Sequence, residues 1–183
     1  MVVAPGPPVR VNRVPQPRDR RAGAGLTGVV ESGKLRRAYE EVLAEVDAGG
    51  FGPPPAGQLS AEQIVAHLAA NDELMVAATE AVLAGAPFAY YDLETIHRPQ
   101  VDALVAEHGG LDGLAALLRA TSGKLCTLTD RLGLAAETPV ETHLREGFDL
   151  RVEDTLPWGR TLDLHTTVHL PKHLAQLRML RRG

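Results

Sequence analysis

The sequence has few of the residues that build disulfides, thiolate metal clusters and membrane spans. Only one cysteine, Cys126, is present among 183 residues, which excludes an intrachain disulfide and a thiolate zinc cluster. No apolar run approaches the roughly 18 residues that a membrane-spanning helix requires, and no apolar segment follows the N-terminal arginines as in a secretory signal. We therefore expect a soluble, cytoplasmic protein without a membrane partner.

Positive charge and aromatic residues are also scarce. The formal net charge is −4, and aromatic residues make up 4% of the chain. The first 25 residues hold five arginines against one aspartate, so they carry about +4 and leave about −8 for the remainder. Proteins that bind single-stranded nucleic acid combine a basic face with aromatic side chains on which bases stack. The chain after residue 25 is acidic and poor in aromatic residues, so it does not offer this combination. We expect no nucleic-acid partner.

The N-terminal region differs in composition from the rest. Residues 1–29 are rich in proline, glycine and arginine, a composition that cannot bury enough apolar surface to offset the entropy of ordering. We interpret them as a flexible arm, which either contacts an acidic partner or is a solvated tail or an over-extended translation start. Residues 30–183 are expected to form one domain, since this length suffices for a hydrophobic core.

Apolar residues recur at helical spacing in four long segments and one short segment. The second long segment has the clearest start, because Ser60 and Gln63 form a capping-box pattern. The expected helices cover residues 32–47, 61–83, 99–108, 111–132 and 163–181.

Residues 135–160 alternate apolar and polar side chains, which predicts a hairpin or a long ordered loop. Residues 90–96 are interpreted as a connector. Four long helices with one structured crossover are typical of a helical bundle whose metal sites lie between facing helices. The predicted fold is all-α, a four-helix up-and-down bundle with a short extra helix and a hairpin-like crossover before the last helix.

Three histidines, His165, His169 and His173, follow one another at a spacing of four in the last predicted helix. Neighbours at this spacing lie on one helix face, so two imidazoles can bind one ion. The outer two are about 12 Å apart along a straight helix, whereas a metal–nitrogen bond is about 2.0–2.1 Å. All three therefore cannot bind the same ion, and either pair remains open. His67 and Asn71 lie within the apolar stripe of the second helix.

Buried imidazoles need a partner, since an unsatisfied buried polar group costs about 1–3 kcal/mol. Two histidines one turn apart and a third from a facing helix would leave one position of a metal ion for water or substrate, as in catalytic zinc sites. The alternative is that each histidine is satisfied separately within the core.

Two segments carry a family resemblance. Residues 60–74 read SAEQIVAHLAANDEL, and residues 165–177 read HTTVHLPKHLAQL. A histidine followed by leucine on the second helix, paired with a terminal H-x-x-x-H-x-x-x-H-x-x-Q segment, resembles the DinB/YfiT-like superfamily of metalloenzymes. These proteins are four-helix bundles and include thiol-dependent S-transferases and mycothiol-dependent maleylpyruvate isomerases. The resemblance spans residues 35–180 in architecture but is specific only at these motifs.

The resemblance implies a site on residues of both motifs. It makes His67, His169 and His173 the ligands of one divalent metal, zinc or nickel, and places Gln176 where the family commonly has glutamine. His165 becomes a neighbour one turn earlier that supports the fold or a ligand. Homodimers are common in the superfamily, and we expect one here.

The resemblance also implies a chemistry, either transfer of a low-molecular-weight thiol to a small-molecule substrate or a hydrolysis. Arginine outnumbers lysine 16 to 3, a bias of GC-rich genomes, and in an actinobacterium of that kind mycothiol would be the thiol. The isomerase branch usually has glutamate where this chain has His169, so isomerase activity is not expected. The alternative is a non-catalytic metal-binding or stress-response bundle, in which the ion only joins two helices.

Three further residues bear on the predicted site, and none is assigned as catalytic. Asn71 is expected to hydrogen-bond a ligand imidazole or a bound water, or else to satisfy a buried water. Trp158 either walls the pocket or fills the core. Pro171 lies between two predicted ligands and lacks a backbone donor, so it should kink the helix unless the helix begins later.

Overall fold

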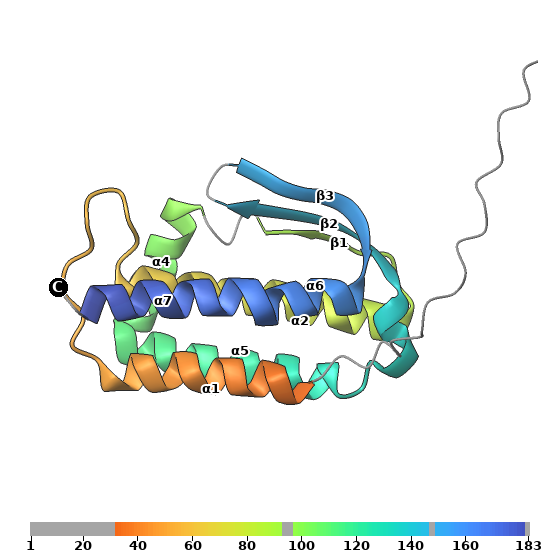
Figure 1. Ribbon diagram of the computed structural model, residues 1–183, viewed down its shortest axis with the longest axis horizontal. Coiled ribbons are helices and arrows are strands. Elements are labelled where there is room, and N and C mark those ends of the chain that lie inside the picture. Colours follow the sequence, from red (N-terminus) through yellow and green to blue (C-terminus); the bar gives the residue numbers. More distant parts are fainter. Residues whose placement is uncertain (1–31, 93–96, 147–148, 182–183) are drawn as a thin grey trace, which may run out of the picture.

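The computed structural model describes residues 32–92, 97–146 and 149–181 of the chain, and the predicted arm at residues 1–29 lies outside them (Figure 1). Most of the described residues are helical. The helices are α1 Ser32–Ala48, α2 Ala61–Ala84, α4 Arg98–His108, α5 Leu111–Thr129, the 3₁₀ turn η1 Gly133–Glu137, α6 Trp158–Leu164, the π-helical segment η2 His165–His169 and α7 Leu170–Arg181.

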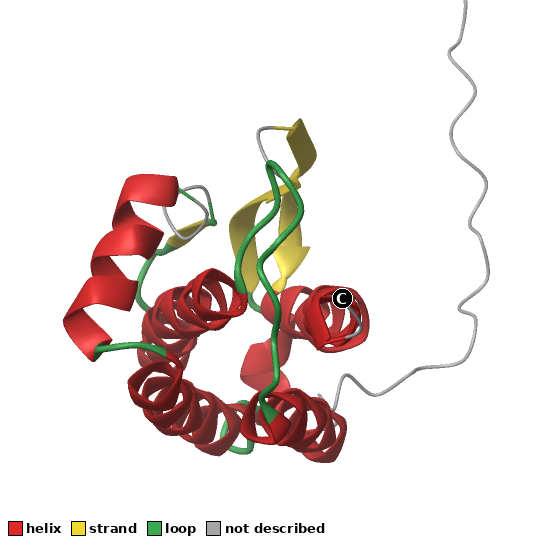
Figure 2. Cartoon of the chain, turned by 90° about the vertical axis from the view of Figure 1, so that its left-hand side faces the viewer, coloured by secondary structure: helices red, strands yellow, loops and turns green. Residues whose placement is uncertain are grey.

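Four long helical rods lie side by side around one core, formed by α1, α2, α5 and the continuous run of α6, η2 and α7 (Figure 1). Figure 2 views them end-on and shows the rods as a ring with the sheet on its outer side. Each rod turns an apolar stripe inward, because its apolar residues recur every three or four positions. Fully buried side chains from the four rods include Leu35, Leu68, Leu118 and Leu177.

A three-stranded sheet accompanies the helices, which corrects the predicted all-α class. Its strands are β1 Ala89–Tyr91, β2 Pro139–Glu146 and β3 Asp149–Pro157, in the order β1-β2-β3. β2 and β3 pair antiparallel, as predicted for the crossover, whereas β1 pairs parallel with β2 through the register Tyr90 to Thr142. A strand of three residues is too short to show alternation, so residues 90–91 were expected within a connector.

The start and end of α2 follow from local hydrogen bonds. The Ser60 hydroxyl accepts from the Gln63 N–H at 3.2 Å, and the Ser60 N–H donates to the Gln63 side chain at 3.0 Å, which confirms the capping box. Gly85 ends the helix with a φ of 65°, a left-handed conformation that favours glycine. These caps set the bounds of α2, and its apolar stripe decides which residues face the core.

The last rod begins at Trp158 rather than Asp163, and it does not break at Pro171. In η2 the N–H of Leu170 donates to the His165 carbonyl, five residues back. This wider turn gives room for the proline ring, which in a regular α-helix clashes with the carbonyl four residues earlier. The hydroxyls of Thr166 and Thr167 donate to the carbonyls of Leu162 and Asp163 at 2.8 and 2.7 Å. The predicted kink is thus replaced by a π-helical turn.

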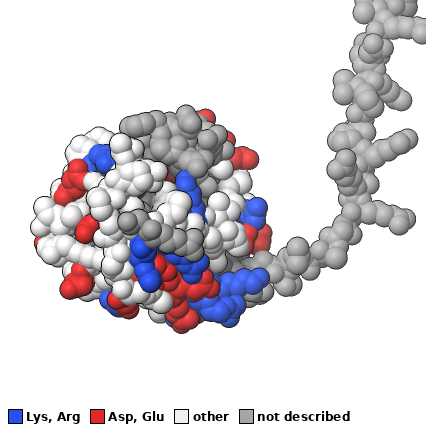
Figure 3. Space-filling model, turned by 60° about the vertical axis from the view of Figure 1, so that its left-hand side comes forward, with Lys and Arg blue, Asp and Glu red and all other residues white. Residues whose placement is uncertain are grey.

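Opposite charges are mixed on the described surface. Glu45 on α1 accepts hydrogen bonds from Arg178 at 3.3 Å and Arg181 at 2.8 Å, and so ties α1 to α7. The face drawn in Figure 3 likewise places basic and acidic side chains next to one another. No helix within the described ranges is long and apolar enough to cross a membrane.

Candidate metal centre

Three of the predicted site residues converge where α2 faces the last rod. His67 lies on α2, His169 ends η2, and His173 lies one turn further on α7. The Nε2 atoms of His67 and His173 lie 3.0 and 3.1 Å from Nε2 of His169. One ligand atom from each of the three residues lies within 4.8 Å of the others, and the described residues contain no other such group of metal-binding side chains.

These distances fit a divalent ion. With metal–nitrogen bonds of about 2.0–2.1 Å and tetrahedral angles, two ligand nitrogens are separated by about 3.3 Å, close to the two distances above. The donor set of three imidazoles suits zinc and nickel. The residues present can therefore hold the ion that the sequence predicts, with His169 as the shared member of both short contacts.

His169 and His173 are neutral, which is the form that binds metal. His67 and His173 are buried, and His169 is partly buried. Burial lowers the pKa of His169 and of His173 well below the usual value, and the neighbouring imidazoles lower both further. Their lone pairs are thus available at neutral pH without loss of a proton.

The π-helical turn helps to align the imidazoles. On an α-helix each step of four residues turns about 40° beyond a full revolution, so three histidines at this spacing would drift around the rod. A π turn holds more residues and therefore offsets part of this drift in the step from His165 to His169. The ring centroids of successive histidines lie 5.0 and 4.6 Å apart. Single π turns inside α-helices frequently occur at functional sites.

Gln176 fixes the tautomer of one ligand. Its side-chain oxygen lies 2.7 Å from Nδ1 of His173. An amide oxygen only accepts, so His173 donates from Nδ1. A neutral imidazole has a single N–H, which leaves Nε2 of His173 with a lone pair directed at His169.

His165 and Asn71 lie beside the ligands. Nδ1 of His165 is 3.0 Å from Nδ1 of His169, and Asn71 Nδ2 lies 3.4 Å from the same His165 atom. The hydroxyl of Tyr90 donates to Asn71 Oδ1 at 2.6 Å, which orients the amide. Burial lowers the pKa of His165 to about 3, so this ring is also neutral. His165 thus contacts the proposed ligand His169 directly, whereas Asn71 contacts His165 and not a proposed ligand.

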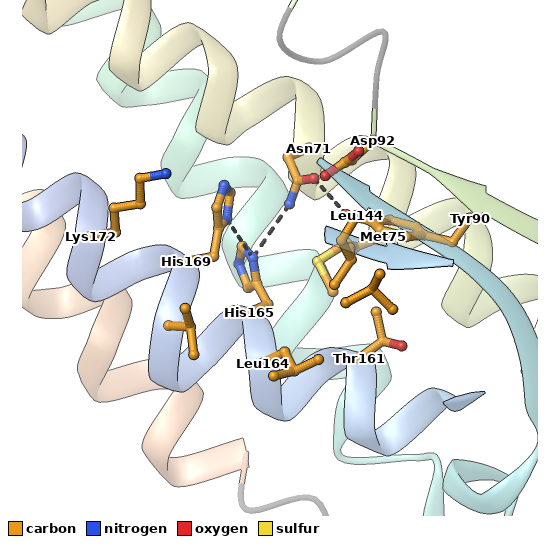
Figure 4. Close-up of a pocket in the computed structure, with 12 residues that line it drawn as sticks. Asn71, Met75, Tyr90, Asp92, Leu144, Thr161, Leu164, His165, His169 and Lys172 are labelled. Atoms are coloured by element: carbon orange, nitrogen blue, oxygen red, sulfur yellow. Dashed lines mark hydrogen bonds between the residues drawn. The ribbon is translucent and has the colours of Figure 1, made fainter. Parts of the chain in front are cut away.

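A pocket opens onto the centre through His169. It has a volume of about 230 Å³ and is lined by α2, the sheet and the last rod, with Asn71, His165, His169 and Lys172 around one part of it (Figure 4). The remaining wall is mostly apolar and comes from different elements. It includes Met75, Leu144, Val152, Leu164 and Val168.

Trp158 lies behind this pocket. It is fully buried, donates from Nε1 to the Thr79 hydroxyl at 3.0 Å, and packs edge-on against Tyr90, which lines the pocket. Trp158 itself is not among the lining residues. Trp158 therefore fills the core and does not wall the pocket.

Two buried residues of the site, Tyr39 and Asp72, were not singled out from the sequence. Tyr39 donates to Asp72 Oδ1 at 2.6 Å, and its oxygen lies 2.8 Å from Nε2 of His165. Asp72 is fully buried and also accepts from Thr121 at 3.3 Å. Their positions carried a signal, because Asp72 follows Leu68 by four residues and so occupies the core stripe of α2, where a carboxylate is unusual.

No family model, curated protein or solved structure matches the chain. The resemblance to the DinB/YfiT-like superfamily therefore rests on the two sequence motifs alone.

Proposed function

We propose that the protein is a metal-dependent enzyme that acts on a small molecule at a centre formed by His67, His169 and His173. The observation that carries the proposal is the convergence of three imidazole Nε2 atoms, one of which belongs to a residue that lines a pocket. Three protein ligands are typical of catalytic zinc sites, whereas structural sites usually have four. A bound zinc or nickel ion would supply Lewis acidity that lowers the pKa of a water or thiol.

The pocket supports a small substrate with a largely apolar body. Apolar side chains from α2, the sheet and the last rod would exclude water from the substrate, and a drier site strengthens electrostatic interactions with the centre. Lys172 and Asp92 contribute opposite charges to the lining. A polar substituent oriented by either charge would place the reactive part of the substrate beside His169.

The reaction we propose is transfer of a low-molecular-weight thiol, with hydrolysis as the related option. In the transfer a carbon–sulfur bond forms, the bond to the leaving group breaks, and the thiol proton passes to solvent or to the leaving group. The resemblance to the DinB/YfiT-like superfamily supports this choice and, with it, a four-helix bundle architecture and a homodimer. The excess of arginine over lysine adds mycothiol as the proposed thiol, and we also propose a cytoplasmic location.

The second candidate is a non-catalytic metal-binding or stress-response protein. His67 lies on α2, and the other two histidines lie on the last rod, so one ion would join two helices that are far apart in the sequence. Such an ion would stabilise the fold without turnover. Ligands from two helices that are far apart in the sequence are expected of a structural metal site as well as of a catalytic one.

A thiol-consumption assay distinguishes the two candidates. The zinc- or nickel-loaded protein and the metal-free protein are incubated with mycothiol or glutathione and a panel of small electrophiles, and free thiol is titrated over time. Enzyme function predicts consumption at least about tenfold faster with metal, abolished in His169→Ala and retained in His97→Ala, which replaces an exposed histidine outside the cluster. Equal rates with and without bound metal would favour the non-catalytic candidate.

A further inference from the structure

We propose that Tyr39 and Asp72 are positioning residues of the metal centre, which act through His165 to hold the proton of His169 on Nδ1 and to present its Nε2 as a ligand. The inference rests on the metal site proposed above. It assigns a role to a tyrosine on α1 and a carboxylate on α2 that the resemblance does not cover.

The four side chains form a continuous hydrogen-bonded chain through the core. Asp72 is 0% exposed, and Tyr39 is 3% exposed. The links measure 2.6 Å from the Tyr39 hydroxyl to Asp72 Oδ1, 2.8 Å from that hydroxyl to His165 Nε2, and 3.0 Å from His165 Nδ1 to His169 Nδ1. Every link has ordinary hydrogen-bond length, and none of the three joins two of the Nε2 atoms assigned to the metal, so each of these links contains one proton.

The proton order follows from the Asp72 end. Tyr39 has one hydroxyl proton and donates it to the carboxylate, so its oxygen can only accept from His165. His165 therefore carries its proton on Nε2, and its Nδ1 is an acceptor. The proton shared between the two Nδ1 atoms then belongs to His169, whose Nε2 is left with a lone pair.

Asn71 supports the same order independently. Tyr90 donates to Asn71 Oδ1 at 2.6 Å, so the amide nitrogen is the atom that faces His165 Nδ1 at 3.4 Å. An amide nitrogen only donates, which again requires Nδ1 of His165 to accept. Two separate contacts thus assign the same tautomer to His165.

The outcome is a set of lone pairs aimed at one point. Gln176 leaves Nε2 of His173 unprotonated, and the chain from Asp72 does the same for Nε2 of His169, 3.1 Å away. Two lone pairs at this distance repel unless a cation lies between them. Burial raises the pKa of Asp72 well above its usual value, and the hydrogen bonds from Tyr39 and Thr121 oppose that rise by favouring the ionised form. A cation at the centre would favour the negative charge of this carboxylate further.

Nuclear magnetic resonance of the metal-free protein tests the proton order. Long-range proton–nitrogen correlation spectra distinguish the two imidazole tautomers at each histidine. We expect the proton on Nδ1 in His169 and His173 and on Nε2 in His165. A His169 proton on Nε2, or a His165 proton on Nδ1, would overturn the inference.

A Tyr39→Phe variant tests the consequence for binding, with zinc affinity measured by competition against a chromophoric chelator. We expect affinity to fall about 10- to 100-fold, the usual effect of removing a group that orients a ligand. The matched control is Thr129→Val, which also removes one buried hydroxyl. The Thr129 hydroxyl donates to the backbone carbonyl of Leu125 at 2.9 Å and not to a residue of the site. Thr129 lies eight residues beyond Thr121 on α5, about 12 Å along the axis, and its replacement should leave affinity unchanged.

The two proposals fail in different ways. Absence of zinc or nickel uptake by the wild-type chain would refute the metal centre. Wild-type uptake with an unchanged affinity in Tyr39→Phe would refute the positioning role and leave the metal centre standing. A Tyr39→Phe loss that Thr129→Val matches would assign both effects to general stability and would also refute the positioning role.

Discussion

His165 lies beside the proposed metal ligands and stays neutral across the physiological pH range. Burial lowers its pKa to about 3, and the proximity of His67 contributes further. In the unfolded chain the same residue titrates near pH 6.5. Folding therefore excludes a proton from this side chain, and the stability of the metal-free protein must depend on pH.

We expect His165→Gln to flatten that pH dependence. Because the pKa of His165 is lower in the folded chain, this residue makes a contribution to stability that is fully present above about pH 6.5. The contribution is lost as the pH falls toward 3, because in that range only the unfolded chain binds the proton. Between those values one such histidine changes the free energy of unfolding by about 1.4 kcal/mol per pH unit. Urea unfolding of the metal-free proteins between pH 6.5 and 5 measures both slopes.

The comparison between the two proteins isolates His165. Burial raises the pKa of Asp72, which gives the opposite dependence, but this carboxylate is present in both proteins. The other buried histidines are also common to both. Wild-type and His165→Gln slopes that agree within error would contradict the assigned protonation state.

Residue types predicted a histidine cluster, and the family resemblance selected the three proposed ligands within it, but neither predicted the hydrogen-bonded chain behind them. Three histidines with a histidine on a facing helix give a pattern that can be found without a structure, and Gln176 follows from the same motif. Tyr39 and His165 are 126 positions apart, so their contact depends on how α1 packs against the last rod. No local pattern carries that information.

The π-helical turn is the element that most affects the site. Pro171 explains its location, because a proline cannot donate to the Thr167 carbonyl as the next residue of an α-helix would. The wide turn changes the rotation between His165 and His169 while α7 continues regularly through His173. The position of His165 relative to the proposed ligand His169 thus depends on a residue that contributes no ligand atom.

We expect Pro171→Ala to weaken metal binding about tenfold without unfolding the protein. Alanine restores an N–H that can draw the last residues of η2 into a regular α-turn, which would rotate His165 and His169 relative to His173. Chelator competition measures the affinity, and thermal melting measures the fold. The control is Met179→Ala, an exposed position on α7. An unchanged affinity in Pro171→Ala would show that the turn is not needed for the ligand geometry.

Periodicity predicted the long helices well and the short elements poorly. The observed bounds of α1 and α2 differ from the expected ones by one residue at the C-terminal end, because each helix carries a full apolar stripe. β1 has three residues and depends on pairing with β2, which lies about fifty residues later in the chain. The π turn was not predicted, because over a single turn the spacing of apolar residues is nearly the same in an α-helix and in a π-helix. The two differ in whether the backbone N–H donates to the carbonyl four or five residues earlier.

At the scale of the whole molecule, the proposed ion connects the early and late parts of the chain. His67 belongs to α2, and the other ligands belong to the rod that closes the helical ring (Figure 2). A ligand that binds only the folded chain stabilises it by about 2.7 kcal/mol at a concentration one hundred times its dissociation constant. Metal binding should therefore raise the melting temperature, whether or not the centre is catalytic.

Elemental analysis of the tag-free protein, with thermal melts before and after chelation, tests the central claim most directly. We predict close to one zinc or nickel ion per chain, a melting temperature that falls on chelation, loss of the metal in His169→Ala with the helical circular dichroism retained, and full metal content in His97→Ala. A wild-type chain that contains no metal, takes up none when zinc or nickel is added, and melts at the same temperature throughout would contradict the metal centre.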